Sequence, residues 1–352
     1  MNLRRRPMKL TDIDQCIAAI AIHRESDSIY DGHLEPLKNI LVQLVGSEGF
    51  LAFVFEDLDG QQVQLLGIGA IAFLNDEFVE QAKKPPFFWI APTLVQQLLS
   101  GHIPILSDVE VRKENALGGL TAFAWPLGFR TEHLSRPEVL NFLMGSFMNE
   151  LQGYRLKEYL GQTLDVEGAR TSLHSGATLL TPTGLYTALP AGREEQVLLN
   201  PHLFVITRER ALEKVGAWSS SLFIYSPPLI YFSRSEQRLL SQALRGLTDE
   251  EVADELGISP SGVKKTWRSA YLRVERSSID ILPKTTDQTE YGDRGRGKKH
   301  HLLAYVREHL EELRPISAKL LRKVQKDARN GLKKNGPSTS RRRVGRPRSA
   351  RP

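Results

Sequence analysis

The chain has 352 residues, of which 41% are hydrophobic, and its 47 Lys and Arg outnumber its 41 Asp and Glu to give a net charge of +6. This length predicts two domains, and the hydrophobic content excludes a wholly disordered protein. The single cysteine, Cys16, excludes an intrachain disulfide and argues against a thiolate zinc site. No apolar run approaches the roughly 18 residues of a membrane-spanning helix, so we expect a cytoplasmic protein.

The positive charge is concentrated near the C-terminal end. Residues 317 to 352 contain 13 Lys or Arg and one acidic residue, Asp327, which leaves residues 1 to 316 with a net charge of −6. A basic block at one end of a chain is typical of an arm that binds a polyanion. We therefore expect residues 317 to 352 to form a basic, largely disordered tail. The alternative is a solvated terminus without a specific partner.

The first 225 residues predict a mixed α/β domain. Residues 8 to 22 are typical of a short strand followed by a helix, with Thr11 or Asp12 as its cap. Residues 50 to 55 and 63 to 74 predict two strands, and the turn between them indicates a hairpin. Further along the chain, we expect a helix at 93 to 99, a helix at 138 to 160 and a strand at 202 to 206.

Three short, capped helices are predicted after Pro227 and Pro228, which mark a linker. The expected N-terminal caps are Ser233 with Glu236, Thr248 with Glu251, and Ser259, which is followed by Pro260 at the first helical position. Gly246 and Gly257 are expected to end the first two helices. Only residues 257 to 259 separate the second helix from the third, which is the short glycine-containing turn of a helix-turn-helix.

The third of these helices, residues 260 to 276, is predicted to have two different faces. Apolar side chains recur on one side, and the helix carries five cations against one acid, Glu275. A helix that enters the major groove of DNA needs donors that reach base edges and cations that contact phosphates. We predict base readout by Ser261, Lys265 and Arg268 and phosphate contacts by Lys264, Arg273 and Arg276. The alternative is a solvated basic face on a small helical domain.

Residues 232 to 275 resemble the LuxR-type helix-turn-helix. The matching residues are Ser233, Glu236, Leu240, Gly246, Glu251, Val252, Ala253, Leu256, Ser259, Pro260, Val263 and Lys264. The chain departs from the pattern at Gly262, where the family usually has Thr, and at Thr266, near a position where His is common in the family. The resemblance implies a four-helix module that binds double-stranded DNA as a homodimer, and we expect its fourth helix at 302 to 313.

A second DNA-binding motif is suggested within the tail. The residues Arg343, Gly345, Arg346, Pro347 and Arg348 resemble an AT-hook, which lays a flat Gly-Arg-Pro core into the narrow minor groove of A·T-rich DNA. Val344 stands where that motif usually has its first Arg. The alternative for this segment is plain binding to phosphates.

The opening elements of the chain, a strand, a helix over 11 to 22 and a hairpin over 50 to 74, are similar in order to those of a GNAT acetyltransferase domain, and this resemblance covers about 150 residues. That resemblance implies an acyl-CoA site, but the family's pyrophosphate loop has no match. Its nearest counterpart, residues 112 to 119, has the wrong spacing. No Walker loop and no phosphoreceiver cluster is found, and the histidines lack the spacing of metal ligands, so we expect no cofactor and no metal.

These patterns predict three parts: an α/β sensor or GNAT-like domain over 1–225, a LuxR-type helix-turn-helix domain over 230–316, and a tail over 317–352. We expect a sequence-specific transcriptional regulator whose first domain senses a small molecule or dimerises. The alternatives are an acyl-CoA-dependent N-acyltransferase and a sensor or scaffold that uses DNA only as an anchor.

Overall fold

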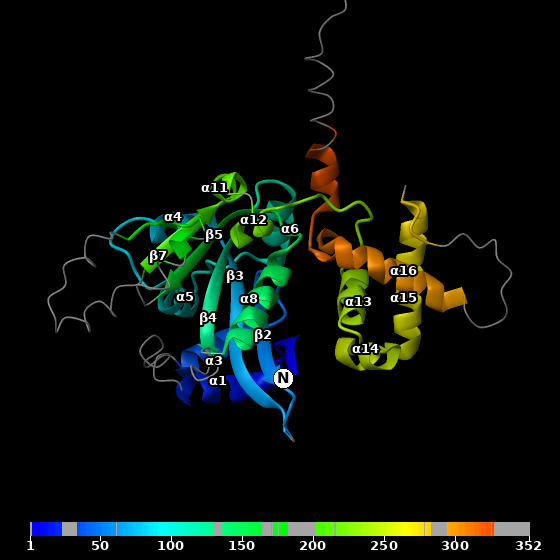
Figure 1. Ribbon diagram of the computed structural model, residues 1–352, viewed down its shortest axis with the longest axis horizontal. Coiled ribbons are helices and arrows are strands. Elements are labelled where there is room, and N and C mark those ends of the chain that lie inside the picture. Colours follow the sequence, from blue (N-terminus) through cyan, green and yellow to red (C-terminus); the bar gives the residue numbers. More distant parts are fainter. Residues whose placement is uncertain are drawn as a thin grey trace, which may run out of the picture.

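The computed structural model describes residues 2–22, 34–60, 62–129, 136–163, 170, 172–174, 176–181, 202–214, 216–277, 279–282, 294–324 and 326. Its described residues form a mixed α/β sheet structure and a separate cluster of helices (Figure 1). None of the helices in these ranges is long and apolar enough to cross a membrane.

The sheet contains seven described strands in the order β1-β2-β3-β4-β5-β7-β6. The strands are β1 (Leu3–Pro7), β2 (Phe50–Asp57), β3 (Gln64–Leu74), β4 (Leu120–Phe129), β5 (Leu156–Thr163), β6 (Thr178–Leu179) and β7 (His202–Thr207). Every neighbouring pair is antiparallel except β4 and β5, which are parallel. The predicted hairpin is confirmed, because β2 pairs with β3 in antiparallel fashion from Phe50 to Asp57.

Helices cover both faces of the sheet, because its strands are apolar on both sides. One core contains buried side chains of α1 (Ile13–Ile22), α3 (Leu34–Leu44), α4 (Asp76–Ala82) and α5 (Ile90–Leu99). The other contains side chains of α6 (Asp108–Ala116), α8 (Pro137–Leu151), α11 (Arg208–Glu213) and α12 (Trp218–Leu222). Within β4 the two sets alternate: Phe123 faces the first core and Ala122 the second.

Two of the predicted boundaries in this region are wrong. The helix expected over 138 to 160 ends at Leu151, and β5 begins at Leu156. Gly153 separates them with a left-handed φ of +81°, and a Cβ there would lie 2.5 Å from the backbone nitrogen of Glu311. The strand expected within 8 to 22 is instead β1, which is followed by the 3-10 turn η1 (Leu10–Asp12).

In the described part of the chain, the second body contains the helices α13 (Arg234–Leu244), α14 (Asp249–Leu256), α15 (Pro260–Arg276) and α16 (Arg294–Glu308). They share a third core that includes Leu239, Val252, Trp267 and Leu302. Helix α16 is the expected fourth helix, but it begins at 294 and ends at 308, before the 3-10 turn η3 (Leu310–Leu313). The prediction of a tail from 317 onward also needs correction, because residues 318 to 324 are helical and Leu321 is buried.

The helical body contacts the sheet structure mainly through polar groups. Arg234 at the start of α13 forms ion pairs with Asp108 (3.1 Å) and Glu48 (3.4 Å). Lys9 reaches Glu255 of α14 at 2.5 Å. Each of these partly exposed ion pairs contributes little stability by itself. The orientation of the helical body relative to the sheet structure therefore depends on several such pairs together.

The linker into the helical body is held by one buried carboxylate. Glu312, which is 1% exposed, accepts hydrogen bonds from the amides of Leu229 (2.7 Å), Ile230 (2.9 Å) and Tyr231 (3.2 Å). The Tyr305 hydroxyl donates to it as well, at 3.2 Å. Burial raises the pKa of Glu312, and these four donors act against that shift because they favour the charged form.

Glu312→Ala is expected to lower the free energy of unfolding by about 1–3 kcal/mol, because the buried amide of Ile230 loses its acceptor. Glu312→Gln keeps one carbonyl oxygen at the site and should recover part of the loss. Urea denaturation followed by circular dichroism measures both variants. Equal stability of the alanine variant and the unchanged protein would contradict this account.

Candidate nucleic-acid interface

The N-terminal caps of α13, α14 and α15 are confirmed by their hydrogen bonds. The side-chain oxygen of Ser233 accepts from the Glu236 amide at 3.4 Å, and that of Thr248 accepts from the Glu251 amide at 3.2 Å. The carboxylate of each glutamate in turn accepts a hydrogen bond from the backbone amide of its cap, which completes a capping box. Ser259 caps α15 by accepting from the Gly262 amide at 3.1 Å.

The turn between α14 and α15 has the geometry that its sequence predicts. Gly257 adopts a φ of 63° and a ψ of 37°, the left-handed conformation that glycine tolerates best. The amide of Ile258 then donates to the carbonyl of Ala253 at 3.0 Å, which satisfies a free acceptor at the helix end. Three residues therefore redirect the chain from α14 into α15.

Helix α15 buries the side that its apolar spacing predicts. Val263, Trp267, Ala270 and Val274 are each at most 5% exposed. Tyr271 is only half-buried, and its ring stacks on Trp267 with the centroids 5.8 Å apart. Lys299 of α16 lies 5.0 Å from the centre of the Trp267 ring and pairs with Asp249 of α14, so α16 supports α15 from one flank.

The opposite side of α15 is exposed and carries most of the predicted DNA contacts. Ser261, Lys264, Lys265, Arg268 and Arg276 are all exposed. Among the described residues, none of the four cations forms an ion pair. Helix α15 lies on the far side of α13 from the sheet (Figure 1). These four cations are therefore free for a partner.

Arg273 differs from the other cations of α15. Its Nε donates to the carboxylate of Glu236 at 2.6 Å, and Glu236 is 1% exposed. The hydroxyl of Ser269 donates to the same carboxylate at 2.7 Å. The sequence predicts a DNA phosphate contact for Arg273. Its side chain remains 38% exposed, but Glu236 neutralises its charge within the protein, so we base the proposed interface on the other cations.

Glu236 is thus a residue whose second role the sequence analysis missed. Its capping function is visible in the local spacing, whereas its partners in α15 lie 33 and 37 residues away. Burial acts to raise the pKa of Glu236, but its hydrogen bonds with Ser269, Ser233 and Arg273 outweigh burial and lower the pKa below the ordinary 4.5. The ionised carboxylate therefore couples the start of α13 to the middle of α15.

The AT-hook-like residues Arg343, Gly345, Arg346, Pro347 and Arg348 lie outside the described part of the chain.

Residues 112 to 119, the nearest counterpart of an acyl-CoA loop, form the end of α6 and the turn before β4. Asp108 and Glu110 lie in the first turn of α6, where Ser107 and Glu110 form a capping box.

A cavity of about 480 Å³ lies in the sheet structure beside the parallel strands. Strands β4 and β5 pair only up to Phe123 and Leu160, although both continue further. The cavity is lined mostly by apolar side chains of β2, β3, β4, β5 and α8, with Phe55, Trp125 and Tyr159 among them. A concave apolar site of this size suits a small organic ligand.

Comparison with known proteins yields no relative of this chain: no protein-family model matches it, and no curated protein matches it significantly.

Proposed function

We propose that the protein is a sequence-specific, cytoplasmic DNA-binding regulator of transcription, with a LuxR-type helix-turn-helix formed by α13, α14 and α15. The observation that carries the proposal is the exposed side of α15, where Ser261, Lys265 and Arg268 recur at helical spacing without an ion pair among the described residues. A short turn and a capped N-terminus precede this helix, as in helices that read the major groove.

The charge distribution supports the same function. Lys264 and Arg276 flank the proposed reading residues and suit phosphates at the rim of the groove. The basic residues of the tail would add affinity that does not depend on sequence. DNA-binding modules of this type usually act as homodimers, and we propose the same here. The apolar cavity between β4, β5 and α8 is the place where a small regulatory ligand would bind.

Selection from a random DNA library tests this function. The full chain and a chain that ends at residue 326 are compared, because the second lacks the AT-hook-like residues. A shared motif in both selections is the expected result, with tighter binding by the full chain. If neither selects a motif, and salt-sensitive binding disappears with the tail, the protein uses DNA only as an anchor and the proposal is wrong.

A second candidate is an acyl-CoA-dependent N-acyltransferase. The strand order and the single parallel pair next to an apolar cavity favour it, because they suit the GNAT-like order of elements. The absence of a glycine-rich pyrophosphate loop in the sequence after β4 argues against it. Isothermal titration of the full chain with acetyl-CoA distinguishes the two: we expect no binding, and micromolar binding would support the enzyme.

A further inference from the structure

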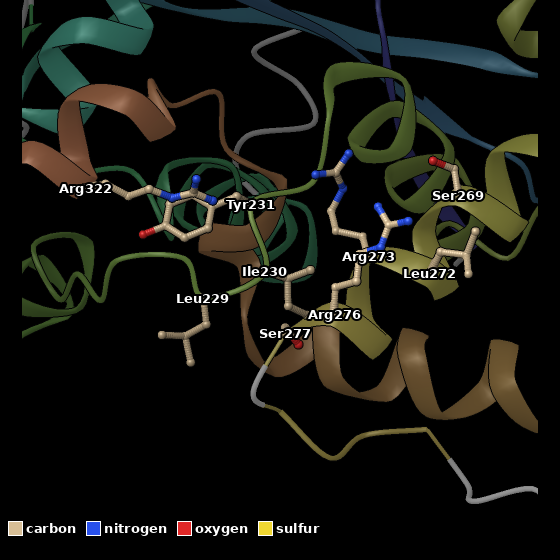
Figure 2. A pocket seen from close by; sticks show the side chains of 9 residues that line it. All are labelled: Leu229, Ile230, Tyr231, Ser269, Leu272, Arg273, Arg276, Ser277 and Arg322. Carbon is tan, nitrogen blue, oxygen red and sulfur yellow. The ribbon is translucent and has the colours of Figure 1, made fainter.

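A small cavity with a basic lining lies at the C-terminal end of α15. It measures about 340 Å³, is open to solvent, and is lined by three segments: the last turns of α15, the linker residues 229 to 231, and Arg322 of the helical residues 318 to 324. Figure 2 shows the three arginines that reach it, Arg273 and Arg276 from α15 and Arg322 from the helical segment. The three segments are far apart in sequence, so the fold is what brings these cations together.

The lining contains cations without acids. None of the nine residues that line the cavity is an Asp or a Glu. Arg273 is neutralised by Glu236, but Arg276 and Arg322 form no ion pair among the described residues. The guanidinium of Arg322 lies 5.0 Å from the centre of the Tyr231 ring (Figure 2), which holds it by a cation–π contact and leaves its N–H groups available. Two unneutralised guanidinium groups in a cavity favour an anion, and their planar donors match phosphate oxygens.

The wall of the cavity is held in an uncommon conformation. Tyr231 has a φ of +60°, which is costly for a residue with a Cβ. The carboxylate of Glu312 stabilises this conformation through the amides of residues 229 to 231. A strained segment that the surrounding structure holds in place is typical of binding sites. The ring on which Arg322 stacks is therefore positioned before any ligand arrives.

The cavity also has a defined position relative to the proposed reading residues. Arg276 follows Arg268 by eight residues and Lys265 by eleven, which corresponds to about 12 Å and about 16 Å along a helix. The major groove is about 12 Å wide, so a helix whose first turns contact bases reaches the DNA backbone near its last turn. Leu272 and Arg276 are exposed on the same side of α15 as Lys265 and Arg268.

We propose that this cavity binds one phosphate group, held between Arg276 and Arg322, and that in the complex the group is a backbone phosphate of the DNA that α15 reads. The inference rests on the proposed function for the identity of the phosphate, whereas the site itself rests on the two guanidinium groups. It makes the helical residues 318 to 324 part of the DNA-binding surface, outside the segment that resembles the LuxR-type motif.

The test uses the full chain and the variants Arg322→Gln, Arg276→Gln and the double substitution. The dissociation constant is measured over a range of salt concentrations, with the selected duplex and with a scrambled duplex. Loss of one phosphate contact reduces the slope of log K against log salt by about 0.9. Because both arginines hold the same phosphate, each single variant and the double variant should reduce the slope by about this amount, equally on both duplexes.

Lys323→Gln is the matched control, because Lys323 is exposed on the same segment and does not line the cavity. Arg322→Lys retains the charge but loses the planar fork, so it should retain the slope and lose part of the affinity. The inference is overturned if Arg322→Gln behaves like Lys323→Gln on both duplexes.

Two further results separate the inference from the proposed function. A slope that falls with Arg322→Gln while no duplex is preferred supports the phosphate site and contradicts the sequence-specific regulator. Titration with inorganic phosphate distinguishes the sources of the ligand. Binding of inorganic phosphate that Arg322→Gln abolishes, together with unchanged slopes on DNA, would assign the cavity to a free phosphorylated molecule and overturn the assignment to the DNA backbone.

Discussion

Replacing Lys265 and Arg268 together with alanine is expected to remove most of the preference for the selected DNA site while leaving binding to unrelated DNA largely in place. Both side chains are exposed on the outer side of α15, within its first nine residues, and neither forms an ion pair among the described residues. A side chain that makes two hydrogen bonds to a base edge contributes about 1–3 kcal/mol of discrimination. Loss of both therefore reduces the ratio of specific to nonspecific affinity by about 30-fold to about 20,000-fold.

The control for this double variant is Lys264→Ala on the same helix. Lys264 is exposed but turns toward the flank, where we propose a phosphate contact, so its loss should weaken binding to all sequences by the same factor. Competition binding with the selected and the scrambled duplex measures both variants. The urea midpoint should be unchanged in each, because neither substitution removes a buried contact. Full discrimination by the double variant would show that another face of the protein reads the bases.

The sequence predicts the helical body well because its signals there are local. Capping boxes span four residues, and Gly257 signals a left-handed helix end without reference to the rest of the chain. The first helix of the sheet structure and the β2–β3 hairpin are predicted for the same reason, since spacing and turn residues are sufficient. Each of these elements depends on residues that are near neighbours in the chain.

The wrong and missed features depend on distant residues. The apolar side chains of 156 to 160 suit a helix by spacing, but pairing with β4 on one side and with β7 on the other makes this segment a strand. From the sequence, Arg273 is a cation suited to a phosphate contact. Only the structure shows that Glu236 lies beside it and forms an ion pair with it. The cavity of Arg276 and Arg322 joins residues 46 positions apart, and no local pattern indicates that pairing.

Glu236→Ala is expected to be among the most destabilising single substitutions in the helical body. The carboxylate accepts hydrogen bonds from the Ser233 amide, the Ser269 hydroxyl and Arg273, so its removal takes away a capping box and leaves Arg273 without its partner. Breaking a buried pair from one side costs about 3–5 kcal/mol, and we expect about 3 kcal/mol here because Arg273 remains 38% exposed. Denaturant unfolding followed by circular dichroism measures the loss.

Two variants separate the ion pair from the cap. Glu236→Gln keeps an acceptor for the Ser233 amide but carries no charge, so it should lose less stability than the alanine variant. Arg273→Ala removes only the cation. A double-mutant cycle of Glu236→Gln and Arg273→Ala then isolates the energy of the pair, because the two side chains are in direct contact. Additive losses within about 0.5 kcal/mol would show that the pair contributes nothing beyond its separate contacts.

The pH dependence follows from the lowered pKa of Glu236. Since the folded state holds this carboxylate ionised below its ordinary pKa of 4.5, its stabilising contribution is complete above that value and is lost as the pH falls through the folded pKa. The difference in unfolding free energy between the unchanged protein and Glu236→Gln should therefore be largest near neutral pH and shrink below pH 4.5. A difference that is constant from pH 7 to pH 3 would contradict a role for the charge.

If the difference shrinks as expected, the ionised carboxylate sets the orientation of α15 relative to α13. The same substitution should then weaken DNA binding at neutral pH without removing any group of the proposed interface.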